Sequence, residues 1–89
     1  MRVPHPNPAH AGATISFDLA TAQRVSVSVC DVSSQLVRTL VASGELPAGG
    51  HNLIWDGTSA AGTVAGAGIY FVRVTAGGAS VARRVAVLR

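Results

Sequence analysis

The stretch that decides the fold is HNLIWDGTSAAGTVAGAGIYFVRVTA, residues 51–76. Two runs with alternating apolar residues, 52–55 and 69–76, flank a loop of small residues and glycines, and they hold the only tryptophan, Trp55, and the only tyrosine, Tyr70. Period-two alternation with β-branched and aromatic side chains predicts strands. The loop is too long for a tight hairpin, so we expect it to cross between sheets or to wrap one end of a sandwich.

Further strands are predicted on both sides of this pair. Residues 14–20 and 24–30 alternate, and residues 79–88 form a last strand after Gly77-Gly78, which predicts a tight hairpin. Residues 36–41 match helical spacing, but so short a run makes a poor helix, and we predict a strand there. About seven short strands with turns at intervals near ten residues indicate an all-β antiparallel β-sandwich.

One folded domain is expected over residues 13–89, after a linker or irregular lead-in over residues 1–12 that holds three prolines and no periodicity. The apolar residues that share one parity in each strand predict a core between two sheets. They are Ile15, Phe17, Leu19, Val25, Val27, Val29, Leu40, Leu53, Trp55, Tyr70, Val72, Val74, Val85 and Val87. Arg83 shares this parity in the last strand, which predicts a bulge or a place at the rim.

The composition limits the classes of function. All seven basic residues are arginines, and apart from Arg83-Arg84 they are scattered without interleaved aromatics, so the net charge of +3 does not indicate nucleic-acid binding. The lack of lysine excludes a Lys–Asn isopeptide crosslink, and the single cysteine, Cys30, excludes an internal disulfide. No apolar run approaches the roughly 18 residues of a membrane span, and the N-terminus lacks the apolar segment of a signal peptide. We expect a monomer without membrane insertion.

The charged and histidine residues do not form a convincing metal site. His5, His10 and His51 are candidate ligands together with Asp31 or Asp56, but no pair has the spacing of a known site, and two of the histidines lie in the lead-in. Calcium would need several oxygen ligands, and four dispersed acids supply too few. We interpret the histidines as solvent-exposed and the two aspartates as residues that hold turns.

Other candidate sites also have a structural interpretation. Cys30 ends an alternating strand, so we interpret it as a packing residue or an outward thiol rather than a nucleophile. The pattern G-x-x-x-G-x-G at residues 62–68 is followed by no helix that would supply anion-binding N–H groups. Trp55 and Tyr70 are a candidate platform for sugar rings, but in a chain with four aromatics we expect them in the core. The sequence therefore predicts neither an enzyme nor a cofactor site.

Several groups of residues, taken in chain order, carry a family resemblance. They are PNP at 6–8 with TISF at 14–17, VCDV at 29–32 with LVRTL at 36–40, GH at 50–51 with WDG at 55–57, Gly62 and Gly68 with IYF at 69–71, and the ending 84–88. Together they resemble the FlgD Ig-like family, which is named for a domain of the flagellar hook-capping protein and is similar to the C-terminal sorting domains of type IX secretion substrates. The chain departs from the family pattern at Ser34-Gln35, where the family has Gly-Arg, and at Cys30, where it has an aromatic residue.

The resemblance implies an Ig-like β-sandwich that serves as an accessory module and has no catalytic residues. The residues expected to structure its turns are Asp31, Asp56, Gly57, Gly62 and Gly68. The expected function is that of a noncatalytic C-terminal module of an exported bacterial protein, secreted or at the cell surface, serving secretion sorting, surface anchoring or assembly. The alternatives are a scaffold domain of a flagellar hook-capping protein, a carbohydrate-binding module and a simple stabilising spacer.

The expected partner is a protein, such as secretion machinery, a neighbouring domain or an assembly neighbour. A strand near a chain terminus is accessible, and its edge offers unpaired backbone groups for strand addition. The residues of this candidate partner-binding edge are Arg83, Arg84, Val85, Val87 and Arg89.

Overall fold

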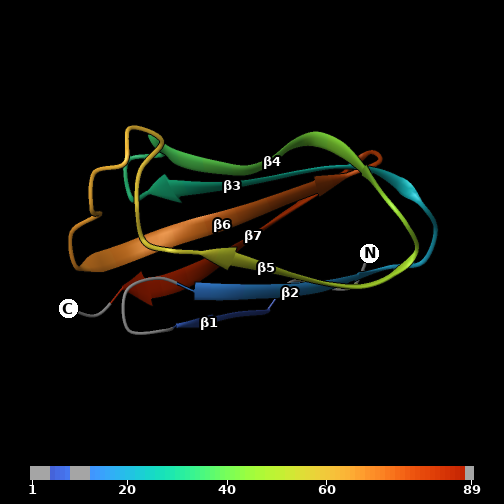
Figure 1. Ribbon diagram of the computed structural model, residues 1–89, viewed down its shortest axis with the longest axis horizontal. Helices are drawn as coiled ribbons and strands as arrows, with labels where there is room; N and C mark the ends of the chain where they lie inside the picture. Colours follow the sequence, from blue (N-terminus) through green and yellow to red (C-terminus); the bar gives the residue numbers. More distant parts are fainter. Residues whose placement is uncertain (1–4, 9–12, 88–89) are drawn as a thin grey trace.

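Seven strands in the described part of the chain form two antiparallel sheets that face each other (Figure 1). The computed structural model describes the backbone of residues 5–8 and the backbone and side chains of residues 13–87. The strands are β1 (His5–Pro8), β2 (Ala13–Leu19), β3 (Gln23–Asp31), β4 (Leu36–Leu46), β5 (Gly49–Trp55), β6 (Gly68–Ala76) and β7 (Ala79–Val87). One sheet has the order β1-β2-β5 and the other the order β4-β3-β6-β7. The predicted all-β, Ig-like antiparallel sandwich is confirmed.

The core lies between the sheets and consists of side chains of one parity from each strand. Buried and half-buried residues alternate without a break along β2, and the valines of β3 and β6 are fully buried. The buried set is Ala13, Ile15, Phe17, Leu19, Val25, Val27, Val29, Trp55, Val72, Val74, Ala76, Val85 and Val87. Leu40, Leu53 and Tyr70 are only partly buried and pack against this set. Each fully buried valine contributes about 1.5–3 kcal/mol relative to an exposed one, so the alternation itself carries much of the stability.

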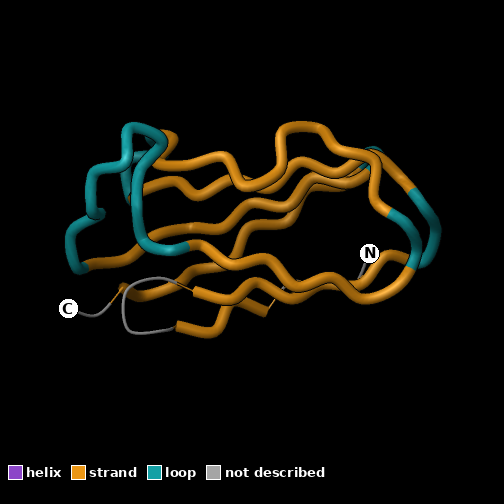
Figure 2. Tube along the Cα trace, in the orientation of Figure 1, coloured by secondary structure: helices purple, strands orange, loops and turns teal. Residues whose placement is uncertain are grey.

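The connections place loops at the two ends of the sandwich (Figure 2). β5 belongs to the three-stranded sheet and β6 to the four-stranded sheet, so the loop over residues 56–67 crosses between the sheets, which is the first of the two alternatives predicted for it. At the opposite end, Ala76 pairs with Ala79 across the two-residue turn of the β6–β7 hairpin. Gly77 has a φ of 59°, the positive φ that a type II′ turn requires at its first central residue.

The lead-in is less irregular than expected, because residues 5–8 form β1. Within residues 5–8 and 13–87, this strand pairs with β2 alone, in a register that sets Pro6 opposite Ile15 and Pro8 opposite Ala13. Proline has no N–H to donate, so it is tolerated in a strand that pairs on one side and rare in a central strand. The two prolines that indicated a linker are therefore compatible with an edge strand.

β4 is a strand, as predicted, but it continues to Leu46 and does not end near residue 41. Its register against β3 shifts three times, so that Thr39 faces Ser28 while Val41 faces Val27. The residue between them, Leu40, is the extra residue of a bulge and packs against the core. These shifts explain the helical spacing of apolar residues in this segment, because a bulge changes which face the following residues occupy.

Arg83 lies in a regular part of the sheet. The β6–β7 register runs without a shift, and Arg83 sits opposite the buried Val72 while its own side chain is exposed. Of the two outcomes predicted for this position, the rim is observed and the bulge is not. An inward-parity charge on an edge strand disfavours edge-to-edge aggregation. Residues 5–8 and 13–87 contain no helix long and apolar enough to cross a membrane.

Candidate functional site

The turn between β3 and β4 is built around the carboxylate of Asp31. Its Oδ1 accepts hydrogen bonds from the Ser33 N–H at 2.9 Å, from the Ser33 hydroxyl at 2.7 Å and from the Gln35 N–H at 3.0 Å. These bonds, led by the one from the hydroxyl, lower the pKa of Asp31 below its ordinary value of 3.8. Ser34 completes the turn with a φ of 67°, in the left-handed region that glycine adopts most easily. The turn therefore keeps a backbone suited to the glycine of the family pattern although a serine stands there.

The loop between β5 and β6 begins with a second aspartate-centred turn. Asp56 Oδ1 accepts hydrogen bonds from the Thr58 hydroxyl at 2.6 Å and from the Thr58 N–H at 3.0 Å. The Thr58 hydroxyl is the main cause that lowers the pKa of Asp56, and the positive charge of Arg38 adds to it. Gly57 supplies a φ of 82° between the two residues.

The rest of this loop folds back on itself through its backbone. The Ser59 N–H donates to Thr63 O at 2.8 Å, and the Gly62 N–H donates to Ser59 O at 2.9 Å, with a φ of 84° at Gly62. The Ala65 N–H donates to Gly57 O at 2.8 Å. Because these bonds satisfy backbone groups that regular strands would pair, the loop holds a defined shape.

Side chains from both sheets fix the loop in place. Arg38 on β4 donates through Nη1 to Thr58 Oγ1 at 2.7 Å and to Ser59 O at 3.1 Å. The indole of Trp55 donates through Nε1 to Thr58 O at 2.9 Å, and the Tyr70 hydroxyl donates to Gly66 O at 2.7 Å. The loop is thus bonded to β4, β5 and β6, and together with the turn over residues 31–35 it forms what we call the Asp31 end of the sandwich.

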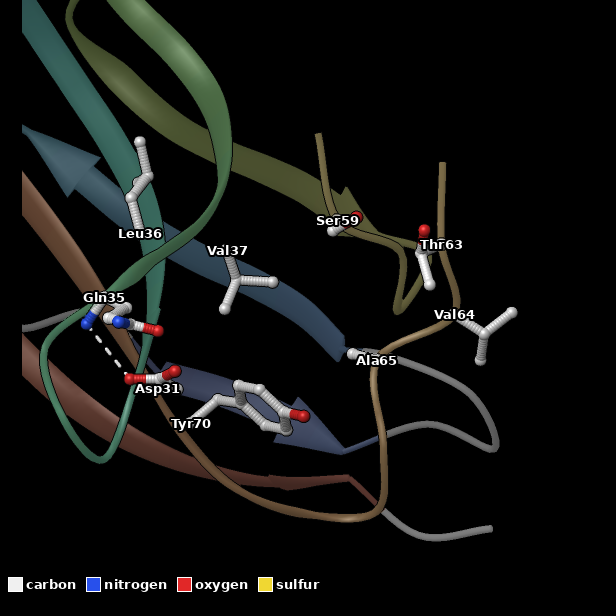
Figure 3. Close-up of a pocket in the computed structure, with 9 residues that line it drawn as sticks. All are labelled: Asp31, Gln35, Leu36, Val37, Ser59, Thr63, Val64, Ala65 and Tyr70. Carbon is white, nitrogen blue, oxygen red and sulfur yellow. Dashed lines mark hydrogen bonds between the residues drawn. The ribbon is translucent and has the colours of Figure 1, made fainter. Parts of the chain in front are cut away.

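A cavity of about 320 Å³ opens at the Asp31 end, between the turn, the first residues of β4 and the loop (Figure 3). Its lining mixes polar and aliphatic side chains: Asp31, Gln35, Leu36, Val37, Ser59, Thr63, Val64, Ala65 and Tyr70. Among the side chains that the structure describes, no histidine or cysteine lines this cavity. Such a cavity can receive an apolar side chain, while the polar groups at its rim can hydrogen-bond the backbone that carries that side chain.

A second hollow, of about 300 Å³, lies on the other side of the same turn, on the outer face of the four-stranded sheet. Its lining is Cys30, Asp31, Val32, Ser34, Phe71, Arg73 and Ala82. Asp31 borders both spaces, so the turn over residues 31–35 separates two adjacent concavities.

The exposed apolar residues gather around these two hollows. Among the described side chains, the exposed large hydrophobic residues are Val32, Leu36, Ile54, Val64, Ile69 and Phe71. All but Ile54 lie at the Asp31 end, in its turn or loop or at the adjoining ends of β4 and β6. The largest exposed fractions there are 72% for Val32 and 62% for both Leu36 and Val64. A cluster of exposed apolar side chains on a soluble surface indicates a binding site more strongly than single ones do.

The structure divides the candidate edge residues into two kinds. Arg83 and Arg84 are exposed on β7, which pairs only with β6 in its sheet, whereas Val85 and Val87 are buried in the core. Of these four residues, only the two arginines present their side chains to a partner, and β1 lies close to β7. Arg89 lies outside the described residues.

The other candidate residues do not come together into a chemical site. Trp55 is only 1% exposed, so its ring is not a platform for sugars. Cys30 is half-buried on β3, while His51 lies on β5 of the other sheet, where its ring stacks on Phe17 with centroids 5.5 Å apart. No three His, Cys, Asp or Glu side chains within the described part of the chain are grouped to hold a metal ion. The side chain of His5 and all of His10 lie outside the description.

Sequence reasoning missed the apolar cluster, although a signal for it was present. Val32 lies within a polar turn and Val64 within a glycine-rich loop, where apolar residues have no strand parity to satisfy. Leu36 was less predictable. Its outward position opposite Cys30 depends on the register shifts of β4.

Comparisons with known proteins agree with this architecture. The family described as FlgD Ig-like domain matches residues 7–80. The solved structure of FlgD from P. aeruginosa is similar to this chain with a TM-score of 0.64 at 22% identity, and the similarity covers 83% of this chain and 59% of that one. A search of curated proteins finds no match. At that identity the structural likeness shows the fold, whereas the family match spans most of the sequence, and the chain belongs to the FlgD Ig-like domain family.

Proposed function

We propose that this domain is a noncatalytic scaffold module that holds protein neighbours together in an exported bacterial assembly. The carrying observation is the apolar cluster at the Asp31 end, which combines exposed valine, leucine and phenylalanine side chains with two adjoining hollows. Membership of a family named for the flagellar hook-capping protein favours this scaffold role over the secretion-sorting role. In this proposal, the protein that contains the domain is exported and acts in an assembly at the cell surface.

The way the cluster is held supports a binding role. The turn and the loop that display it are fixed by side-chain bonds of Asp31, Asp56, Arg38 and Tyr70. A surface held rigid before binding loses less conformational entropy when a partner docks. A spacer would need no such organisation, because its function depends only on length and stability.

The sorting role at the chain terminus is less well supported. Val85 and Val87 fill the core, so removal of residues 85–89 would unfold the sandwich and would not report on sorting alone. The informative variant is the double substitution Arg83→Gln and Arg84→Gln, which leaves the buried valines in place. Unchanged export of this variant is expected if the domain acts as a scaffold.

Site-specific photo-crosslinking tests the scaffold role directly. A photo-reactive amino acid replaces the exposed Leu36 at the Asp31 end, and in a matched strain it replaces the exposed Asn52 on β5 of the other sheet. The protein is expressed in its native host and crosslinked adducts are identified by mass spectrometry. We expect a defined adduct with another exported protein from position 36 and none from position 52. Adducts from neither position, in a protein that remains folded and exported, would leave the spacer function instead.

A further inference from the structure

We propose that the outer face of the four-stranded sheet at the Asp31 end binds an acidic protein segment, with an apolar side chain in the hollow beside Phe71 and with carboxylates on Arg73 and Arg84. This inference rests on the proposed scaffold function and specifies the chemistry of the partner. The surface consists of Cys30, Val32, Phe71, Arg73, Ala82 and Arg84, and we call it the Phe71 face.

The sheet register places these side chains next to one another. Phe71 on β6 lies opposite Cys30 on β3 and opposite Arg84 on β7. Two residues further along β6, on the same face of the sheet, Arg73 lies opposite Ala82 on β7. Because Ala82 and Arg84 are also two residues apart, Arg73 and Arg84 are diagonal neighbours. Residues at such diagonal positions are about 7–8 Å apart. In an extended partner segment, alternate residues point to the same side and lie about 7 Å apart. Two carboxylates on one side of such a segment can therefore reach both arginines.

The hollow of the Phe71 face follows from the sizes of its side chains. Phe71 and Arg73 project from β6, while their neighbours Cys30 and Ala82 on the adjacent strands are small. Val32 closes one side with an exposed fraction of 72%. The resulting space of about 300 Å³ is large enough for an aliphatic or aromatic side chain, whose burial would remove both its own surface and that of Phe71 from water.

The two arginines bring more positive charge to this face than the single carboxylate of Asp31 offsets. Within the described residues, neither Arg73 nor Arg84 has an ion pair or a side-chain hydrogen bond, and the residues directly opposite them across the sheet (Ser28, Ala82 and Phe71) are uncharged. Asp31 also lines the hollow, and its Oδ1 accepts three hydrogen bonds within its own turn rather than an ion pair from Arg73. Two unpaired guanidinium groups beside an apolar hollow favour a partner that brings carboxylates, because Arg binds them through paired hydrogen bonds.

The occupant is an acidic protein segment rather than a second copy of this chain or a nucleic acid. The chain's four acids stand singly along the sequence, so no segment of it offers two neighbouring carboxylates. A phosphate backbone would satisfy the arginines but would bring no aliphatic group to the hollow. A protein segment with Asp or Glu residues close to a large apolar residue supplies both.

Selection from a displayed library of random peptides tests the proposal on the whole chain. The immobilised wild type captures the peptides, and an excess of soluble Arg73→Gln/Arg84→Gln double variant removes those that do not need the two arginines. We expect enriched peptides to carry acidic residues next to a large apolar one. Their affinity should fall at least about tenfold for the double variant and for Phe71→Ser, and at higher salt. Arg24→Gln is the matched control, because Arg24 lies on the same outer face at its opposite end, and its binding should not change.

Each other outcome overturns the proposal. Enriched peptides without acids, peptides that bind the double variant equally well, or no enrichment at all would show that the Phe71 face does not select acidic segments. Sedimentation that reveals a dimer lost in the double variant would assign the face to a second copy, and equal, arginine-dependent binding of a DNA duplex would assign it to nucleic acid. Far-UV circular dichroism of each variant confirms its fold. If the photo-crosslinking experiment gives adducts from position 36 but the peptide selection does not enrich acidic peptides, this inference is wrong and the scaffold function is still supported.

Discussion

Trp55 and Tyr70 meet edge to face, with ring centroids 5.3 Å apart and an angle of 64° between the ring planes. One ring comes from the end of β5 and the other from the start of β6, so this contact joins the two sheets where the chain crosses between them. Both rings also donate a hydrogen bond to the crossing loop, from the indole to Thr58 O and from the phenol to Gly66 O. The aromatic pair therefore ties the core to the loop that carries part of the apolar cluster.

Truncation of Trp55 should unfold much of the population. The indole is 1% exposed, and Trp55→Ala removes its packing, its contact with Tyr70 and the bond to Thr58, for a loss of about 3–5 kcal/mol. Urea denaturation followed by circular dichroism measures this loss. The control is Ile54→Ala at the neighbouring position, which is 76% exposed and should change stability by no more than about 0.5 kcal/mol. Equal effects of the two variants would contradict the buried position of Trp55.

Arg38 and Thr58 should be energetically coupled. Their hydrogen bond of 2.7 Å links β4 to the crossing loop in a partly buried setting. In a double-mutant cycle with Arg38→Met and Thr58→Val, we expect a coupling free energy of about 1 kcal/mol. Additive effects of the two substitutions would show that the loop is held without this bond. Hydrogen exchange of the Ala60 N–H, which donates to Val37 O, should accelerate in the Arg38 variant.

Ser34→Gly should stabilise the domain. Ser34 has a φ of 67°, and its side chain makes no hydrogen bond within the described residues. Glycine would remove a backbone strain of about 1–2 kcal/mol at this φ. Part of this gain would be lost because glycine has more conformational entropy in the unfolded chain. We expect a net gain of about 0.5–1 kcal/mol in thermal or urea unfolding. The same substitution at Ser33 should have the opposite sign, because it removes the hydroxyl bond to Asp31. A loss of stability in Ser34→Gly would contradict the strained turn.

Stability should decrease in acid through Asp31 and Asp56. The pKa of each carboxyl is lowered in the folded state from an ordinary value of 3.8, so the folded chain releases these protons more readily than the unfolded chain. Their contribution is fully present well above that ordinary value and is lost as the pH falls through the lowered pKa values of the folded state. Urea midpoints measured from about pH 5 down to about pH 2 should fall less steeply for Asp31→Asn and Asp56→Asn than for the wild type. Parallel curves would show that the two turns do not depend on ionised carboxylates.

Much of the fold could be predicted because the relevant information is local. Along β2 and β3, successive side chains alternate between the faces of a strand, and the apolar residues follow the same period, so a few neighbouring residues specify both strand and core face. The Asp31 and Asp56 turns are equally local, since each carboxylate bonds groups only a few residues away. The crossing loop was predictable from its length, because too many residues separate β5 and β6 for a hairpin.

Only the tertiary structure decided which surface is available for binding. The partial burial of Leu40 and the exposure of Leu36 follow from the bulges of β4, which depend on pairing with β3 and leave no reliable period in the sequence. The Phe71 face likewise exists because antiparallel pairing brings Cys30, Phe71 and Arg84 into one row from three separate strands. Alternation determines which side of its own strand a residue faces, whereas its neighbours across the sheet are set by register, a long-range property of the folded chain.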